Sequence, residues 1–270
     1  MSVPSMISIE TLRTVHPSAS VTAEDPGYDP EYELVQPLNL YDSPQLTRLA
    51  TQAIAGRHLR LRWSDLPEPL TPQISAIPVR LCEDDYPGWL NPRDLGSLIP
   101  CALAYHPVPL DAATIQARIP AVIDYTHQAM AVENEYLWGG TLGPNFDCSG
   151  LVQRAFGSQG IWLPRDAYQQ EAFSSALPHS APSPQAMVEL LVPGDLIFFG
   201  TPAKATHVAL YLGQGRYIHS SGKDQGRNRI GIDSLVQLDH PVSQTYHRQF
   251  RGAGRVVESY RGNQPWVVQS

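Results

Sequence analysis

The sequence predicts an α+β protein in which a β-rich N-terminal half precedes a half that contains both helices and strands. In the first half, short apolar runs alternate with turn-forming residues over residues 31–104, which is typical of a small β-barrel. In the second half, apolar side chains recur at helical spacing over residues 112–130 and again after residue 148. Two strand-like runs, residues 195–199 and 207–212, follow these helices, and this order indicates an α+β domain.

Four segments are expected along the 270 residues. Residues 1–28 are rich in Ser, Thr, Pro and acidic groups and show little periodicity, so we expect a mobile tail. Residues 29–104 form the predicted barrel, and residues 105–111 form a linker stiffened by its prolines. Residues 112–270 form the second domain.

Alternation with a period of two residues marks the clearest strand of the barrel. Leu59, Leu61 and Trp63 alternate with polar residues, as on a strand with one buried face. Further strands are expected at residues 32–35, 38–41 and 76–81, and Tyr86-Pro87-Gly88-Trp89-Leu90 indicates a turn that enters a last strand.

The first helix of the second half is expected to begin at Ala112, because Asp111 can accept hydrogen bonds from its free N–H groups. Pro120 lies inside the helical pattern and is expected to end or kink its first part, since proline lacks a backbone N–H. A second, buried helix is expected to begin at Cys148, between a turn-rich stretch and an apolar one.

After that helix, residues 174–185 are rich in Ser, Pro and Ala and are expected to form a loop. The strand-like run 207–212 is followed by the glycine-rich turn 213–215, and residues 217–220 are then expected to pair back as a hairpin.

Composition limits the classes of function. The net charge is −7 and the pI about 5.7, so the chain lacks the basic surface that binds nucleic acid or an anionic membrane. No apolar run approaches the roughly 18–20 residues of a membrane span, and residues 1–15 do not resemble a signal peptide. The three cysteines have no metal-ligand spacing and, being odd in number, do not indicate a disulfide framework. We expect a cytoplasmic protein without metal, cofactor, nucleic-acid or membrane partners; its oligomeric state is not predicted.

Cys148 is the candidate nucleophile. A helix N-terminus carries partial positive charge and unpaired N–H groups, and both favour the thiolate over the thiol. Its small neighbours Ser149 and Gly150 leave the sulfur accessible, whereas a cysteine that only fills the core would favour bulky neighbours. The alternative is a buried structural cysteine, because apolar residues follow it in the helix.

His207 and His219 are the candidate base and orienting group. The predicted hairpin brings the two imidazoles together, and a cysteine, a histidine and a polar third group are the parts of a papain-like nucleophile. Two other interpretations are open: either histidine can be a hydrogen-bonded core residue, or both can bind zinc together with Cys148.

Five ordered motifs resemble the NlpC family, cell-wall peptidases with a circularly permuted papain-like fold. They are Tyr136-Leu137-Trp138-Gly139-Gly140, Phe146-Asp147-Cys148-Ser149-Gly150-Leu151-Val152, Leu163-Pro164-Arg165-Asp166-Ala167, Pro193-Gly194-Asp195-Leu196-Ile197-Phe198-Phe199, and the histidine hairpin His207–His219. The β-rich half resembles a bacterial SH3-like module, including its Asp84-Asp85-Tyr86-Pro87-Gly88-Trp89 run. The pairing of the two is similar to γ-D-glutamyl-L-diamino acid endopeptidases of the cyanobacterial type.

The resemblance implies a role for each matching residue. Cys148 matches the nucleophile, His207 the general base and His219 the third member of the catalytic group. Tyr136 matches a tyrosine near the nucleophile that aids the oxyanion region. The implied substrate-binding residues are Asp147, Ser149 and Asp166 in the groove and Tyr86 and Glu83 from the SH3-like wall.

Simpler interpretations stand beside some of these roles. Tyr136 and Trp138 can be core aromatics, and Arg165 and Asp166 can form a solvated ion pair.

The activity implied by the resemblance is hydrolysis of the bond between D-Glu and the diamino acid in murein stem peptides. The expected partner is a small peptide, L-Ala-γ-D-Glu-diamino acid with a free N-terminus, and the expected setting is recycling of cell-wall peptides. Two alternatives are an amidase or acyltransferase on the same scaffold and an inert binder of wall peptides, because a fold does not fix the reaction.

Overall fold

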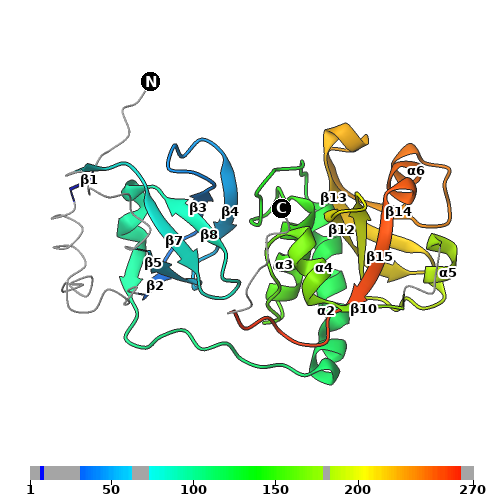
Figure 1. The fold of residues 1–270 in the computed structure, drawn as a ribbon, viewed down its shortest axis with the longest axis horizontal. Helices are drawn as coiled ribbons and strands as arrows, with labels where there is room; N and C mark the ends of the chain where they lie inside the picture. The colour runs from blue at the N-terminus through cyan, green and yellow to red at the C-terminus, as the bar shows by residue number, and fades with distance from the viewer. Residues whose placement is uncertain (1–6, 9–30, 63–72, 179–182, 263–270) are drawn as a thin grey trace. The chain divides into compact units, whose positions relative to one another are not determined.

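The computed structural model describes residues 7–8, 31–62, 73–178 and 183–262, without the side chains of residues 7–8 and 73–74. The chain divides into two compact units, Met1–Pro107 and Val108–Ser270, and the division falls within the segment expected to be a linker. Each unit is described by itself (Figure 1). Of the expected tail, only β1 (Ile7–Ser8) is described, and it pairs with β6 (Gln73–Ile74). Trp63 and the rest of the tail lie outside the described residues.

The first unit is a seven-stranded antiparallel sheet in the order β4-β3-β8-β7-β5-β2-β9. Its strands are β2 (Glu31–Leu34), β3 (Leu38–Tyr41), β4 (Leu49–Ala53), β5 (His58–Leu61), β7 (Ile77–Leu81), β8 (Pro87–Leu90) and β9 (Leu98–Pro100), with a short 3₁₀ helix η3 (Pro92–Ser97) before β9. One apolar cluster collects residues from every strand, including Ala53 and Leu98 on the two edges. The sheet therefore curves around a single core, as a barrel does.

Two strands of this seven-stranded sheet are not expected from the sequence. β4 has only leucine and alanine as apolar residues, and β9 has three residues and ends in a proline, so neither shows a clear period. Both lie at the edges of the sheet, where each pairs with one neighbour.

The second unit is built on a six-stranded antiparallel sheet in the order β10-β15-β11-β12-β13-β14. The strands are β10 (Ser175–Ala176), β11 (Leu196–Gly200), β12 (Ala205–Gly213), β13 (Arg216–Ser221), β14 (Arg229–Ser234) and β15 (Phe250–Arg255). The helices are α2 (Ala112–Ala131), α3 (Cys148–Gly157), α4 (Ala167–Phe173), α5 (Pro184–Val188) and α6 (Pro241–Arg248), with a 3₁₀ turn η4 (Lys223–Gln225). The expected hairpin is present as β12 and β13, with Tyr211 opposite Tyr217.

Helices cover both faces of this sheet. One apolar core joins α2 and α3 to the side of the sheet that carries Phe198 and Val208. A second core on the other side joins Phe199 and Ala209 to Tyr246 of α6. Figure 1 shows α2, α3 and α4 together on the first face and α5 and α6 on the second.

Two expectations for the second unit are wrong in part: Pro120 does not end its helix, and the Ser/Pro/Ala-rich stretch is not all loop. Helix α2 continues through Pro120 for eleven further residues to Ala131, because Pro120 and Gln116 lie on its exposed side, where water can bind the carbonyl that loses its partner. Residues 174–185 are not all loop: Ser175 and Ala176 pair with β15, and α5 begins at Pro184. Within the described residues, none of the helices is both long and apolar enough to span a membrane.

Candidate active site

Cys148 is the first residue of α3, as the sequence predicts, and Asp147 is the residue that caps it. The Asp147 carboxylate accepts the N–H of Gly150 at 2.6 Å and the N–H of Gly139 at 2.9 Å. One side chain therefore ties the start of the helix to the preceding Trp-Gly-Gly loop, and it fixes where the cysteine lies.

Glycine is required where that loop crosses the helix. A Cβ on Gly150 would lie 2.0 Å from the carbonyl oxygen of Gly140, and a Cβ on Gly140 would lie 2.7 Å from the carbonyl oxygen of Asn145. The Gly140 carbonyl also accepts the N–H of Asp147 at 3.1 Å. The two glycines therefore allow backbone to pack directly on backbone beside the cysteine.

A buried ion pair stabilises the same turn. Arg165, only 1% exposed, donates to both carboxylate oxygens of Asp147, at 3.1 and 2.5 Å, and to the Oγ of Ser149 at 3.0 Å. The interpretation of Arg165 and Asp166 as a solvated pair is therefore wrong, because Arg165 is buried and bonded to Asp147. The assignments of Asp147 and Ser149 to substrate binding stay predictions, and in this structure their side-chain oxygens are engaged with the protein.

The expected thiolate is not found in this state. The pKa of the Cys148 thiol is raised to about 12, chiefly by burial and next by the Asp147 charge, while hydrogen bonds from the Val208 and Ser149 backbone oppose both effects. Desolvation of the sulfur therefore outweighs the partial charge of the helix N-terminus, which was expected to favour the thiolate. A base must take the proton from this sulfur before it can attack.

The candidate base, His207, is positioned by the sheet. The backbone of Val208 contacts the Cys148 sulfur, and His207 precedes it on β12. The Nε2 of His207 lies 2.7 Å from the Nδ1 of His219, which is completely buried on β13. The structure thus brings together the three residues that the sequence predicts as catalytic.

The chain of hydrogen bonds continues to an aspartate that sequence reasoning missed. The Nε2 of His219 lies 2.9 Å from a carboxylate oxygen of Asp233 on β14, and Arg227 donates to the same oxygen at 2.6 Å. Ser243 donates to the other oxygen at 3.0 Å. Asp233 follows the apolar residues Ile230 and Ile232 on β14. A charged residue on a largely buried strand was the signal in the sequence that could have pointed to it.

Both imidazoles are neutral at pH 7. Burial lowers the pKa of His207 well below its usual value, and the neighbouring His219 lowers it further. Burial also lowers the pKa of His219, against the opposing effect of its hydrogen bond to Asp233. A neutral His207 is able to accept a proton, which a general base requires.

Aromatic rings surround this pair. Tyr246 of α6 stacks on His207 with ring centroids 4.4 Å apart, and its hydroxyl lies 2.9 Å from the Oγ of Ser221. Tyr136 is half-buried, and burial raises the pKa of its hydroxyl, followed by the charges of Cys148 and Asp147. Tyr136 therefore lies near the thiol as a protonated hydroxyl, whereas Trp138 is 58% exposed and is not a core residue.

Asp166 is half-buried and caps α4, where its backbone N–H donates to Gln169 at 2.9 Å. It follows Arg165 directly, so α4 and the buried ion pair fix its place. Its role in substrate binding stays a prediction.

The two expected groove residues of the first unit differ in accessibility. The Glu83 carboxylate is buried and bonded to Arg57 at 3.0 Å and to the backbone N–H of His58 at 2.6 Å. Within the first unit its carboxylate is engaged with Arg57 and His58, and its role in substrate binding stays a prediction. Tyr86 is half-buried and stays a prediction.

A metal site finds little support among the described residues. The His207 and His219 nitrogens that face each other are joined by a hydrogen bond, so they do not both point at one ion, as the zinc interpretation would need. Elsewhere, ligand atoms of Glu31, His58 and Cys101 lie within 4.8 Å of one another. The Glu31 carboxylate is already bonded to Arg60 and to the backbone N–H of Tyr105.

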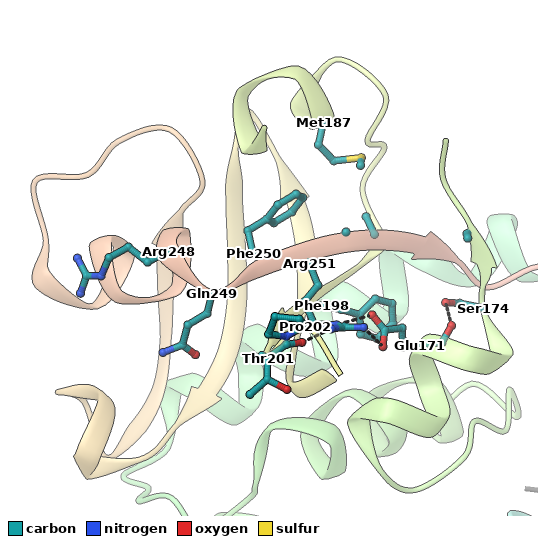
Figure 2. A pocket seen from close by; sticks show the side chains of 14 residues that line it. Glu171, Ser174, Met187, Phe198, Thr201, Pro202, Arg248, Gln249, Phe250 and Arg251 are labelled. Atoms are coloured by element: carbon teal, nitrogen blue, oxygen red, sulfur yellow. Dashed lines mark hydrogen bonds and ion pairs between the residues drawn. The ribbon is translucent and has the colours of Figure 1, made fainter. Parts of the chain in front are cut away.

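A cavity of about 730 Å³ lies beside the sheet, between α4, α5 and β15 (Figure 2). Figure 2 shows Arg251 directed at the carboxylate of Glu171, with which it is paired at 2.9 Å. Cys148, His207 and His219 are not among the residues that line it. Side-chain geometry, and not this cavity, therefore defines the candidate site.

A cysteine at a helix N-terminus beside a neutral, hydrogen-bonded histidine is the arrangement of an acyl-transfer site with a sulfur nucleophile. Comparison with known protein families gives two matches along the chain. Residues 133–251 match the NlpC/P60 family, and residues 40–95 match the bacterial dipeptidyl-peptidase SH3 domain. The chain therefore carries an NlpC/P60 domain preceded by a bacterial dipeptidyl-peptidase SH3 domain, and the predicted resemblance and fold class are confirmed.

Curated relatives that match the chain are named as peptidases. The chain is 40% identical over 125 residues to "Gamma-D-glutamyl-L-lysine dipeptidyl-peptidase" of Bacillus cereus, a match that covers 45% of this chain and 32% of that protein. It is 38% identical over 121 residues to "Bifunctional muramidase/DL-endopeptidase CwlT" of Bacillus subtilis, covering 43% and 33%. The matches thus span about a third of the length of these relatives.

Among solved structures, an NlpC/P60 family protein from Bacillus cereus superimposes with a TM-score of 0.42 and 23% identity, covering 86% of this chain and 65% of that one.

Proposed function

We propose that the protein is a cysteine peptidase that hydrolyses the γ-D-glutamyl–diamino acid bond of murein stem peptides with a free N-terminal L-Ala. The observation that carries the proposal is the placement of Cys148 at the start of α3, beside β12, whose His207 is bonded to His219 at 2.7 Å. A relative named as a γ-D-glutamyl-L-lysine dipeptidyl-peptidase supports the choice of bond.

The first step is proton transfer followed by attack. Because the Nε2 of His207 is bonded to His219, its Nδ1 is the nitrogen left to take the proton of the Cys148 thiol. The sulfur then attacks the γ-carbonyl carbon of D-Glu. The Cys148 backbone N–H, unpaired at the start of a helix, and the protonated hydroxyl of Tyr136 stabilise the oxyanion, and each such donor is worth about 3 kcal/mol.

The second step completes the reaction. Protonated His207 gives its proton to the amine nitrogen of the diamino acid as the C–N bond breaks, which leaves a thioester on Cys148. Water, deprotonated by His207, attacks the thioester carbonyl. L-Ala-D-Glu and the free thiol are released.

Asp166 is our candidate for the group that pairs with the ammonium of a free N-terminal L-Ala. Of the two aspartates in the groove motifs, Asp147 is already neutralised by the buried Arg165, whereas Asp166 is half-buried at the start of α4. A carboxylate paired with an ammonium in a partly buried site strongly disfavours an acylated N-terminus.

We place the reaction in the cytoplasm, on small fragments released from the cell wall and being recycled. The support is electrostatic: with a net charge of −7, the chain has little affinity for anionic wall polymers, whereas a small peptide needs no such attraction.

The test is incubation of the full chain with L-Ala-γ-D-Glu-meso-diaminopimelate, free and N-acetylated, with product analysis by mass spectrometry. We expect L-Ala-D-Glu from the free peptide only. Cys148→Ala should abolish its release, and Cys101→Ala, which removes a thiol of the first unit, should retain it.

Each outcome bears on one part of the proposal. Equal cleavage of the N-acetylated peptide would remove the role of Asp166 and keep the peptidase. Cleavage of neither peptide would favour the amidase or the inert wall-peptide binder, and full activity of Cys148→Ala would remove the nucleophile.

A further inference from the structure

The group that orients the proposed base His207 is itself a histidine, His219, and this affects which nitrogen of His207 carries the proton. An asparagine or aspartate in that place offers an oxygen, which can only accept the Nε2–H of the base. The Nδ1 of a neutral histidine either donates or accepts, depending on the tautomer. His219 alone therefore does not determine which nitrogen of His207 carries the proton.

We propose that Asp233 is a positioning residue that acts through His219 and holds His207 in the one neutral tautomer able to take the thiol proton. The inference rests on the proposed function only for the identity of Cys148 as nucleophile. The tautomers themselves are a property of the protein without substrate.

The argument starts at the carboxylate, which is ionised and can only accept hydrogen bonds. Burial raises the pKa of Asp233, but the hydrogen bond from His219 and the charge of Arg227 outweigh this and lower it below the usual value. Arg227 donates to one oxygen at 2.6 Å and Ser243 to the other at 3.0 Å. Both donors favour the charged form.

The acceptor role of Asp233 then determines which nitrogen donates and which accepts on each of the two imidazole rings. Because Asp233 only accepts, the Nε2 of His219, 2.9 Å away, must carry a hydrogen. In neutral His219 the Nδ1 is then an acceptor, so the Nε2 of His207 at 2.7 Å must donate to it. The Nδ1 of neutral His207 is left with a lone pair, which is what a base for the Cys148 proton needs.

The remaining polar neighbours do not disturb this assignment. The Nδ1 of His240 lies 3.6 Å from Asp233, but it accepts the N–H of Val242 at 3.2 Å, so this nitrogen offers no hydrogen to the carboxylate. Arg227, which faces the same carboxylate oxygen as His219, is a donor only. The hydrogen-bond partners of the Asp233 carboxylate are therefore all consistent with a single arrangement of donors and acceptors from Asp233 through His219 to His207.

Asp233→Asn is the direct test, with Asp195→Asn as the matched control. Asp195 is another buried carboxylate with 1% side-chain exposure, paired with Arg255 at 2.7 Å and away from the histidines. We expect kcat on the free tripeptide to fall about 10³–10⁴-fold in Asp233→Asn, the size seen when a base is held in its wrong tautomer, with KM little changed. Asp195→Asn should lose stability to a similar degree and keep its kcat.

Nitrogen NMR on ¹⁵N-histidine-labelled protein reads the tautomers without any substrate. In the wild type, His207 should show a pyrrole-type Nε2 and a pyridine-type Nδ1. In Asp233→Asn, whose amide can donate to His219, the two types should exchange places on both rings. This reports on Asp233 even if the tripeptide proves to be the wrong substrate, so failure of this inference and failure of the proposed function are distinguishable.

A double-mutant cycle separates positioning from general structural damage. In a His219→Asn background the amide has its own donor and acceptor ends, so the further change Asp233→Asn should cost less than about tenfold in kcat, because the coupling between the two sites is lost. Asp233→Glu, which keeps a carboxylate, should retain the wild-type tautomers. A pyrrole-type Nδ1 on His207 in the wild type, or equal losses from Asp233→Asn in both backgrounds, would overturn the inference.

Discussion

At the scale of single residues, Arg165 holds together the turn that carries Cys148, the proposed nucleophile. Its guanidinium is buried and meets Asp147 and Ser149, the two residues on either side of Cys148. A buried charge that loses its partner is far more costly than an exposed one. The positive charge also opposes the effect of Asp147 on the thiol, since Arg165 lowers the pKa of Cys148.

Arg165→Gln should therefore destabilise the second unit by about 3–5 kcal/mol, because it leaves the Asp147 carboxylate buried without its countercharge. The matched control is Arg251→Gln, whose partner Glu171 is 28% exposed and whose loss should cost at most about 1 kcal/mol. Urea unfolding of both variants measures the difference. Equal losses would show that burial of the Arg165 pair does not set its strength.

Residue-level sequence reasoning placed the reacting groups but not their partners. The places of Cys148 and of both histidines could be predicted, because a cysteine after a turn and two histidines on a hairpin are local patterns. Asp233 and the pairing of Arg165 with Asp147 could not, since each depends on which side chains meet after folding. Burial of Cys148 likewise reversed the expected direction of its pKa, because desolvation depends on the packing around the sulfur.

At the scale of elements, the start of α3 depends on how closely the Trp-Gly-Gly loop approaches it. The Gly140 carbonyl oxygen occupies the space that any side chain at position 150 would need. The loop and helix are further joined to the sheet, because Ser220 on β13 donates to the carbonyl of Phe146 at 2.6 Å. A shift of the loop would therefore move Cys148 relative to the histidines.

Gly150→Ala should lower the stability of the second unit by about 1–3 kcal/mol through overpacking and reduce kcat by about 10²-fold through misplacement of the sulfur. Gly157→Ala, at the other end of the same helix, places its Cβ 3.8 Å from the Trp162 ring and should be neutral or stabilising. Thermal unfolding measures the stability of both variants, and cleavage of the tripeptide measures their kcat. An active, stable Gly150→Ala would contradict the close approach.

Most elements followed from local sequence patterns, and the exceptions have physical causes. The long helix from Ala112 and the histidine hairpin carry clear periods and caps, and both are present. The edge strands β4 and β10 are weak in apolar residues and are held by backbone pairing with a neighbour that the sequence does not identify. Pro120 was misjudged because its effect depends on whether its side of the helix is exposed.

At the scale of the whole molecule, the two units respond to pH in opposite directions. His207 and His219 have lowered pKa values in the folded second unit, so they stabilise it above their unfolded pKa of about 6.5, and this is lost as the pH falls below it. His58 in the first unit has a raised pKa, chiefly through its hydrogen bond to Glu83. Its contribution is fully present below about pH 6.5 and is lost as the pH rises through the folded pKa.

Between pH 8 and pH 5.5 the first unit should therefore gain stability while the second loses it, by up to about 1.4 kcal/mol per pH unit for each of its two histidines below pH 6.5. Amide hydrogen exchange, resolved by peptide, measures each unit in the full chain. His207→Gln should roughly halve the slope of the second unit, and His58→Gln should flatten that of the first. Parallel slopes in both units would contradict this account.

The hydrogen-bonded chain of His207, His219 and Asp233 also has a consequence for how the protein folds. Its members lie on three successive strands and are separated by only 12 and 14 residues, so short loops close their contacts at a small cost in chain entropy. Cys148 belongs to α3, which lies earlier in the sequence and is separated from the three strands by much longer stretches of chain, and such non-local contacts form more slowly. The base system can thus be complete in a half-folded chain, while the thiol joins it only when α3 docks on the sheet. The thiol and the histidines therefore meet only once the helix layer and the sheet of the second unit have assembled.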